Sequence, residues 1–463
     1  MDTVNKWPER ISISRGYLLL TLTVLFILFS FTGWPGEQVL MVLTVGLILY
    51  SLPFMAFFPK IMTSILLITG HLVFFAQGLG FSYWRESLIE NLPLVALFVS
   101  VPLFAYPLKN GGYVEYISII AHRFLKTPVK IFSNIVILTS ILSSFMNLGS
   151  VRISFELFHS EIEKNPKFYT KAISQGFTLA MCWSPYFAGV AIVLSMLGLP
   201  IFPFIFWGLL LVLIGTAVSV LLIMKQPPET EELAAAMDKE MQAARAAPIT
   251  AGKGIELLVI FAGMFAGIFI LERLLDVNLV ILISVIAIAY PILWSVCINK
   301  VQAFGRSLQH YKNTILPNIH NEAVLFIAAA FFAKMVETTP VSPFIASFFA
   351  AINQLSPLLV IVMTIGVIVL LGAGGIHQIL TVSLIGASVS TADLMISVEA
   401  FALALMAGWS LSTVVSPVAA LNLTLGTLLH RSPFKVGMWN LPYVLVTGAF
   451  VSVVIYGISY LTM

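Results

Sequence analysis

Residues 130–150 read KIFSNIVILTSILSSFMNLGS, an apolar run that stops at a polar turn, Asn147-Leu148-Gly149-Ser150. A helix rises ~1.5 Å per residue, so the arm from Lys130 to Asn147 covers about 25 Å, enough to bring its tip near the bilayer midplane. Backbone can be irregular at that depth only inside protein or beside a wet cavity. We therefore expect the segment 131–160 to enter the membrane, turn at Asn147 and leave on the same side, as a re-entrant hairpin.

A second segment, about 358–390, has the same form. It turns at Gly372-Ala373-Gly374-Gly375-Ile376-His377-Gln378, and this glycine-rich turn lies as far from Pro357 as Asn147 lies from Lys130. Two further apolar runs are interrupted by Ser-Pro pairs, at Ser184-Pro185 and at Ser416-Pro417. At these four breaks, two hairpin tips and two broken spans can converge on a common site.

The composition excludes a water-soluble enzyme. The 463 residues are 59 % hydrophobic and only 10 % charged, with a mean hydropathy of +1.01, whereas a soluble domain carries about 25 % charge. Because roughly twenty apolar residues cross one bilayer, the apolar runs predict an all-α polytopic membrane protein with about 11 transmembrane helices and two re-entrant hairpins. The spans are expected near residues 16–31, 39–57, 62–79, 92–108, 172–197, 204–224, 255–271, 279–297, 322–336, 397–429 and 444–461.

The chain divides into two similar halves around one long polar stretch. Residues 1–38 form a tail and an extra first helix, followed by a first repeat, a soluble linker and a second repeat at 39–225, 226–254 and 255–463. Thr127-Pro128 and Ser356-Pro357 precede the two hairpins, and a Ser-Pro pair follows each hairpin at a similar separation. Internal repeats of this kind are typical of transporters.

The distribution of basic residues predicts the orientation, because Lys and Arg collect on the cytoplasmic side. With both hairpins re-entrant and the N-terminus cytoplasmic, 20 of the 24 Lys and Arg residues fall on that side, and the exceptions are Arg85, Arg152, Arg273 and Lys334. The C-terminus is then outside, and spans 2–6 and 7–11 run in opposite directions. We expect an inverted repeat in a plasma or inner membrane.

The four breaks supply the candidate site. Carbonyls at helix C-termini attract cations, and N–H groups at helix N-termini attract anions. Residues expected to contact a small anionic solute are Asn147, Ser150, Arg152, Ser184, Gly375, His377, Ser416 and Asn422, and those expected to bind Na⁺ are Ser144, Asn147, Gly149 and Gly374.

These residues also have structural interpretations. Small residues at a hairpin tip can serve helix packing alone. Arg152 can snorkel to the surface or pair with Glu156, four residues further on. A structural hydrogen bond is an equally good account of His377, and an interhelical packing bond is the alternative for Asn422.

Sodium fits the sequence better than protons as the coupling ion. No span carries an obvious buried carboxylate for a proton relay, since Glu90 and Glu322 head spans near opposite surfaces. His71 is expected to be a packed residue, and Cys182 and Cys297 indicate neither a disulfide framework nor a metal cluster. We expect no cofactor besides the coupling ion, and no nucleic-acid partner.

Three other functions compete with Na⁺-coupled transport. A proton-coupled exporter of an anion or drug could use His377 and His71. An intramembrane enzyme is disfavoured because the sequence has no His-Glu-x-x-His motif and no plausible Ser/His/Asp set at a common depth. A passive channel is disfavoured by the paired closed hairpins.

The arrangement resembles the ion transporter superfamily, which includes divalent anion/sodium symporters, arsenite permeases and TRAP large permeases. Ser144-Phe145-Met146-Asn147 is similar to the hairpin motif of arsenite- and citrate-type members, although Leu148 and Gly149 follow here. The resemblance implies a homodimeric elevator in the lipid bilayer. Spans 1–4 and 7–9 would form its scaffold, and the hairpins with spans 5, 6, 10 and 11 its transport domain. Residues 113–125 and 344–355 would form interfacial arms.

The re-entrant hairpin predicts that Lys130 and Lys164 face the same side of the membrane. Single cysteines at these positions should react with a membrane-impermeant maleimide from the cytoplasmic side only. Labelling of the two cysteines from opposite faces of the membrane would exclude the hairpin and the orientation together.

Overall fold

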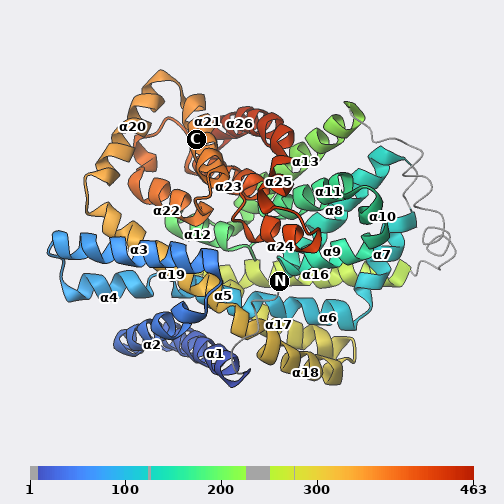
Figure 1. The fold of residues 1–463 in the computed structure, drawn as a ribbon, viewed down its shortest axis with the longest axis horizontal. Coiled ribbons are helices and arrows are strands. Elements are labelled where there is room, and N and C mark those ends of the chain that lie inside the picture. The colour runs from blue at the N-terminus through green and yellow to red at the C-terminus, as the bar shows by residue number, and fades with distance from the viewer. Residues whose placement is uncertain (1–8, 124–126, 226–250, 276) are drawn as a thin grey trace. The chain divides into compact units, whose positions relative to one another are not determined.

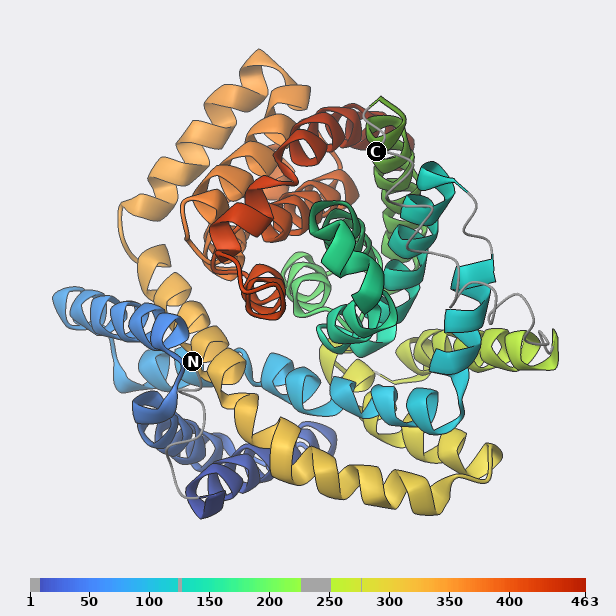
Figure 2. The same ribbon diagram turned by 45° about the vertical axis from the view of Figure 1, so that its right-hand side comes forward.

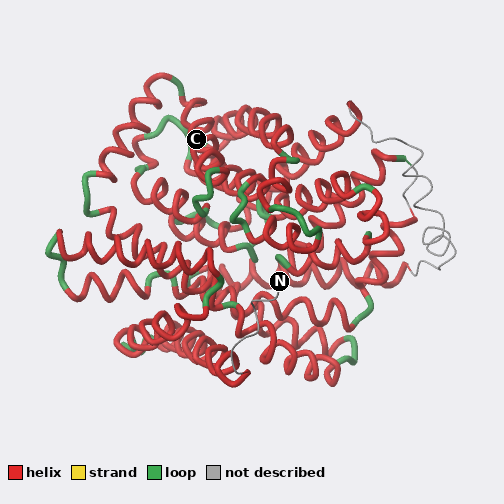
Figure 3. Tube along the Cα trace, viewed as in Figure 1, coloured by secondary structure: helices red, strands yellow, loops and turns green. Residues whose placement is uncertain are grey.

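The computed structural model describes residues 9–123, 127–225, 251–275 and 277–463. Within these ranges every regular element is helical and there is no strand (Figure 3). In the described part of the chain, ten helices are long and apolar enough to cross a membrane, or up to eleven when the bent pair Val301–Asn318 and His320–Glu337 counts as one span. The chain is therefore an all-α polytopic membrane protein, as predicted. The expected linker at 226–254 lies outside the described residues except where α16 (Ala251–Leu274) begins.

The chain forms two compact units, which Figures 1 and 2 show from two directions. The first unit comprises Met1–Pro107, Ala266–Phe348 and Ser383–Val389. Its main helices are α1 (Glu9–Thr32), α2 (Glu37–Ser51), α3 (Phe57–Ala76), α4 (Phe81–Ile89), α5 (Leu92–Ser100), α17 (Leu279–Cys297), α18 (Val301–His310) and α19 (His320–Glu337).

The second unit comprises Leu108–Phe265, Phe349–Val382 and Ser390–Met463. Its helices are α7 (Tyr113–Arg123), α8 (Pro128–Met146), α9 (Gly149–Leu157), α10 (His159–Lys164), α11 (Pro166–Ala180), α12 (Ala188–Leu197), α13 (Ile201–Lys225), α21 (Pro357–Ala373), α23 (Val398–Val415), α24 (Ala420–Leu428), α25 (Pro433–Met438) and α26 (Leu441–Thr462). The unit boundaries fall inside α6 (Ala105–Asn110), α16, α20 (Val341–Leu355) and α22 (Gln378–Ser388).

Two helices of the first unit were not predicted. The connection that carries Arg306 is the helix α18, and the residues before span 4 form the helix α4. Both mix polar with apolar side chains and are shorter than a span, so a search for long apolar runs does not detect them.

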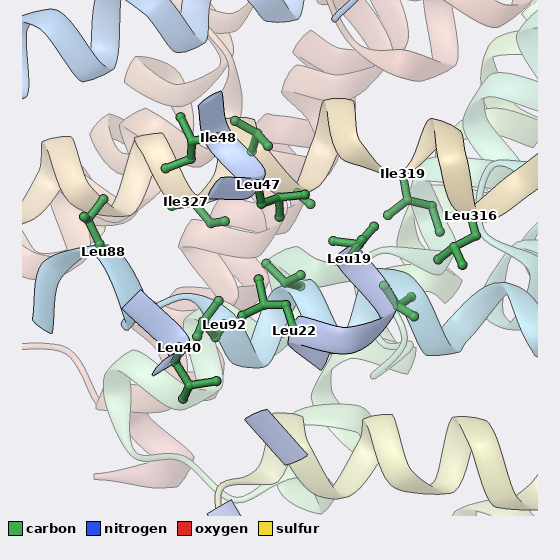
Figure 4. Close-up of a cluster of buried hydrophobic side chains, with 14 of the residues drawn as sticks. Leu19, Leu22, Leu40, Leu47, Ile48, Leu88, Leu92, Leu316, Ile319 and Ile327 are labelled. Carbon is green, nitrogen blue, oxygen red and sulfur yellow. The ribbon is translucent and has the colours of Figure 1, made fainter. Parts of the chain in front are cut away.

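The first unit is held by an apolar core between α1, α2, α5 and α19 (Figure 4). Leu19, Leu47, Leu92 and Ile327 are each at most 1 % exposed. A buried polar contact joins α1 to the start of α19, where Arg15 Nη1 lies 3.1 Å from His320 Nε2. Arginine only donates, so Nε2 accepts and the ring proton sits on Nδ1, which lies 2.6 Å from the carbonyl of Pro317.

The second unit is built around α11 and α23. Every residue from Ala400 to Val415 is buried. Capping explains where both helices start: Asn165 accepts from Phe168 N at 3.2 Å before Pro166, and Ser397 accepts from Ala400 N at 3.1 Å, so each cap satisfies an orphan N–H. α11 packs on α8, and α23 packs on α21.

The contact between α11 and α8 depends on Gly176. A Cβ atom built there would overlap the carbonyl oxygen of Val136 and lie 2.8 Å from Thr139 Cβ. Gly366 on α21 is different, because a Cβ atom at that position would meet no atom within 4 Å.

We predict that Gly176→Ala destabilises the protein by about 1–3 kcal/mol, because the added methyl overpacks a close backbone contact. Gly366→Ala, the matched control in another helix of the same unit, should be neutral or mildly stabilising. Thermal unfolding in detergent measures both. Equal melting temperatures for the two variants would contradict the close approach of α8 and α11.

Candidate functional site

All four predicted breaks are breaks between helices of the second unit. α8 ends at Met146 before α9, and α21 ends at Ala373 before α22. α11 ends at Ala180, ahead of Ser184, and α23 ends at Val415, immediately before Ser416. Each break therefore leaves one helix C-terminus and one helix N-terminus inside the same unit, the arrangement that can attract ions of both signs.

The first tip is a tight turn closed by serine hydroxyls. Asn147 has φ +48° and ψ −132°, a backbone conformation outside the left-handed helical region and uncommon for residues other than glycine. Ser150 Oγ donates to the Asn147 carbonyl at 2.6 Å, and Ser143 Oγ lies 2.6 Å from Ser150 Oγ. The Asn147 side chain is half-buried and makes no hydrogen bond within the described chain. Its amide is therefore available to a ligand.

Ser184 ties the broken fifth span to the first tip. Its hydroxyl donates to the carbonyl of Ser144 at 2.7 Å and accepts from the backbone N–H of Tyr186 at 3.3 Å. The Ser144 hydroxyl in turn donates to the carbonyl of Ile141 at 2.7 Å. Both polar groups of Ser144 are thus engaged, so the predicted Na⁺ ligand Ser144 has a structural role here.

The second tip is a Schellman turn. Ile376 N donates to Leu371 O at 2.9 Å and Gly375 N donates to Gly372 O at 3.0 Å, while Gly375 has φ +93°, which only glycine adopts without strain. His377 Nδ1 accepts from Ile379 N at 3.3 Å and caps α22. The His377 ring therefore makes a structural hydrogen bond, which was the alternative to a role in binding the solute.

Gln378 links the second tip to α23. Its Nε2 donates to Ser412 Oγ at 3.2 Å, and both side chains are buried. The predicted second tip includes Gln378 without assigning it a contact, and Ser412 was not predicted, because a Ser within an apolar helix carries no distinguishing pattern.

Asn422 satisfies the C-terminus of α23. Its Nδ2 donates to the carbonyls of Thr413 at 3.2 Å, Val414 at 2.9 Å and Ser416 at 2.9 Å. The opposite amide orientation would place Oδ1 against three acceptors, so this assignment is the one that the network supports. The packing bond considered as the alternative for Asn422 is present.

The same break contains two buried oxygens without a partner. Asn422 Oδ1 and Ser416 Oγ lie in fully buried side chains, and neither atom has a hydrogen-bond partner in the described chain. Buried polar atoms are usually paired, and an exception requires a ligand, water or strain to explain it. These two atoms are therefore the strongest candidate ligand groups at this break.

Main-chain carbonyls at the breaks are more occupied than the sequence suggested. The carbonyl of Thr178 on α11 accepts from Ser410 Oγ at 2.7 Å, and those of Ser144, Leu371 and Thr413 accept the bonds given above. The buried side-chain atoms without a partner at the break after α23, Ser416 Oγ and Asn422 Oδ1, are both oxygens.

The remaining predicted residues differ in burial. Ser150 is buried and Gly375 is half-buried, whereas Gly149, Arg152 and Gly374 are exposed on this chain. Arg152 makes no ion pair with Glu156 within the 4.0 Å limit of an ion pair. An exposed guanidinium has almost no desolvation cost, so the position of Arg152 does not by itself indicate that it binds a ligand.

His71 is a packed residue, as predicted, and belongs to the first unit. Trp84 Nε1 donates to His71 Nε2 at 3.0 Å, and Nδ1 lies 2.7 Å from the Leu67 carbonyl. Because an indole N–H only donates, the ring proton is on Nδ1. Among the described residues, no group of three or more His, Cys, Asp or Glu side chains could hold a metal ion.

No family model and no curated protein matches this sequence. Solved structures do match in fold. The YdaH transporter of Alcanivorax borkumensis is 16 % identical over 81 % of this chain and 87 % of that chain, with a TM-score of 0.49. MtrF of Neisseria gonorrhoeae is 12 % identical over 85 % of this chain and 94 % of that chain, with a TM-score of 0.55.

The fold is similar to that of MtrF. At this level of identity the likeness concerns the course of the chain and not its side chains, so it leaves the site residues to be judged from the geometry above.

The two Ser-Pro serines should respond differently to mutation. Ser184→Ala removes a hydrogen bond to Ser144 and should cost about 1 kcal/mol of stability. Ser416→Ala removes a hydroxyl without a partner and should leave stability unchanged or slightly higher. Thermal unfolding of the purified variants measures this difference, and a larger loss for Ser416→Ala would show that its hydroxyl is bonded within the protein.

Proposed function

We propose that this protein is a secondary active transporter of a small anionic organic solute. The observation that carries the proposal is the gathering of four helix breaks, with the unpartnered oxygens of Ser416 and Asn422, in one compact unit. Irregular backbone at membrane depth is retained where it binds a ligand or lines a cavity.

The likeness in fold to MtrF supports a transporter, because that protein belongs to a class of antimetabolite efflux pumps. We further propose membership of the ion transporter superfamily and an elevator mechanism. In support, the second unit contains the first hairpin, most of the second hairpin (up to Val382) and spans 5, 6, 10 and 11, while the first contains spans 1–4, 8 and 9. These are the transport and scaffold groups of such a mechanism, and α16, which carries span 7, is divided between the units.

Anion binding is assigned to the N-terminal sides of the breaks. α9, α12, α22 and α24 each begin there, and free N–H groups at helix N-termini favour negative charge. In the proposed site the Asn147 amide and the Ser416 hydroxyl contact the solute. Ser150, Ser184, Gly375 and His377 shape the turns that hold it, and Arg152 contributes positive charge from the exposed side of α9.

Sodium is the proposed coupling ion. The unused atoms at the breaks are neutral oxygens, which suit a hard monovalent cation, and carboxylates are not among them. The proposed Na⁺ ligands are the Asn147 and Asn422 side-chain oxygens, with the backbone at Gly149 and Gly374 alongside. An inward Na⁺ gradient would drive uptake, and the membrane potential would add about 2.3 kcal/mol per charge per 100 mV.

A homodimer in the bilayer is proposed on the same basis. α7 and α20 are the expected interfacial arms, and α20 exposes Phe344 and Leu355 at 68 % and 78 %. Side chains this apolar require lipid or protein contact.

Export is the second candidate for direction, since the likeness in fold is to an efflux pump. Proton coupling has less support, because His377 caps a helix and His71 is held by Trp84.

Reconstitution tests the proposal. In proteoliposomes, a panel of mono- and dicarboxylates should include one that gives Na⁺-dependent flux, measured in both directions. Ser416→Ala and Asn147→Ala should reduce that flux about tenfold or more, because each removes a ligand contact worth ~1–3 kcal/mol. Ser133→Ala is the control, since Ser133 Oγ donates to Val129 O within α8 at 2.8 Å.

Flux that is independent of both Na⁺ and pH would exclude ion coupling. Flux that survives Ser416→Ala and Asn147→Ala at full rate would place the solute elsewhere.

A further inference from the structure

Other buried polar atoms without a hydrogen-bond partner lie outside the break at Ser416. Thr170 Oγ1, Ser174 Oγ and Gln175 Oε1 on α11 have no hydrogen-bond partner in the described chain, and neither has Asn440 Nδ2, which lies between α25 and α26. All four side chains are at most 1 % exposed. We call Thr170, Ser174, Gln175, Asn440, Asn422 and Ser416 the buried polar row.

The α11 members of the row lie on one half of the helix. At about 100° per residue, Ser174 and Gln175 lie about 40° and 140° around the axis from Thr170, whereas Gly176 lies about 240° around it. Gly176 faces α8. The three polar side chains are therefore directed away from α8, toward the other helices that pack on α11, which include α23 and α24.

Short contacts connect four members of the row, Gln175, Asn440, Asn422 and Ser416. Gln175 Nε2 donates to Asn440 Oδ1 at 3.0 Å, and Asn440 N donates to Gly437 O at 2.9 Å. A Cβ atom built on Gly437 would lie 3.2 Å from Asn422 Nδ2, so Asn440 and Asn422 flank the same glycine. Asn422 in turn bonds to the carbonyl of Ser416 at 2.9 Å. These contacts lead from the break of the tenth span to Gln175, and helix geometry places Ser174 and Thr170 on the same half of α11, toward its first turns.

The chemistry of the unused atoms indicates a ligand. Five of the six are oxygens of hydroxyl or amide groups, and the sixth is an amide nitrogen. In either orientation of the two amides, the Gln175–Asn440 pair keeps one acceptor and one donor unused. Neutral oxygens coordinate hard monovalent cations, and the mixture of donors and acceptors suits water molecules in the cation's hydration shell.

The end of the row at α11 has charges of both signs nearby. α10 packs against α11 and carries Glu161, a buried carboxylate that accepts from Ser160 Oγ at 2.9 Å. Exposed Lys167 and half-buried Lys171 flank Thr170 along α11, so the row ends close to the surface of the unit. The predicted orientation makes this the cytoplasmic side.

We propose that the buried polar row is a binding path for a hydrated monovalent cation between the break at Ser416 and the first turns of α11. Several neutral oxygens in series bind a cation weakly enough to release it, which a path requires. This inference rests on the proposed transport function and adds the route by which the coupling ion leaves the site.

Binding of ²²Na⁺ to the purified protein, measured by scintillation proximity, tests the path without a transported solute. Thr170→Val and Ser174→Ala should each weaken Na⁺ binding about tenfold, because each removes an oxygen ligand. Thr170→Ser, which keeps the hydroxyl, should bind as the wild type does. Thr364→Val is the matched control, because buried Thr364 Oγ1 already donates to Val360 O at 2.7 Å.

Unchanged melting temperatures would show that the variants remain folded, since their hydroxyls have no partner to lose. Saturable ²²Na⁺ binding that both variants leave within twofold of the wild type would overturn the path while leaving the proposed function intact. Absence of saturable binding in the wild type would overturn the path and sodium coupling together. Binding that is lost in the variants, in a protein that transports no carboxylate, would support the path and refute the proposed function.

Discussion

The main constraint on this protein is that every backbone group within a bilayer must be satisfied by the protein itself. The second unit contains four helix breaks, and the backbone groups that each break exposes need partners within the protein. Ser184, Ser410 and Asn422 donate to carbonyls in the last turns of α8, α11 and α23. These hydrogen bonds allow irregular backbone to persist among apolar helices, and the candidate site depends on them.

The two Ser-Pro breaks differ in hydrogen bonding. The Ser184 hydroxyl donates to the first hairpin tip, whereas the Ser416 hydroxyl has no partner in the described chain and the neighbouring Asn422 caps α23. One break therefore holds a structural contact, and the other holds a pair of buried oxygens without a partner.

Much of the architecture could be predicted because apolar length and helix punctuation are local signals. The Pro residues at 128, 166 and 357 begin helices, and the turn at Asn147, the glycine-rich tip and both Ser-Pro pairs end them where expected. α18 and α4 were missed because they are short and amphipathic. At the site, the sequence indicated Asn422 and Ser416 but not Gln175, Asn440 or Ser412, whose roles depend on partners far along the chain.

The sequence by itself determined that this is an all-α membrane protein and where its helices break, because hydrophobic length, proline and glycine act through neighbouring residues. Only the tertiary structure decided which polar atoms are satisfied. Asn422 Nδ2 donates to three carbonyls, and its Oδ1 has no partner in the described chain. The side chain of Arg152 is exposed. The partners of Asn422 lie across a helix break, and those of Gln175 and Ser410 lie 265 and 232 residues away. Such groups meet only in the folded chain, so no local pattern could assign them.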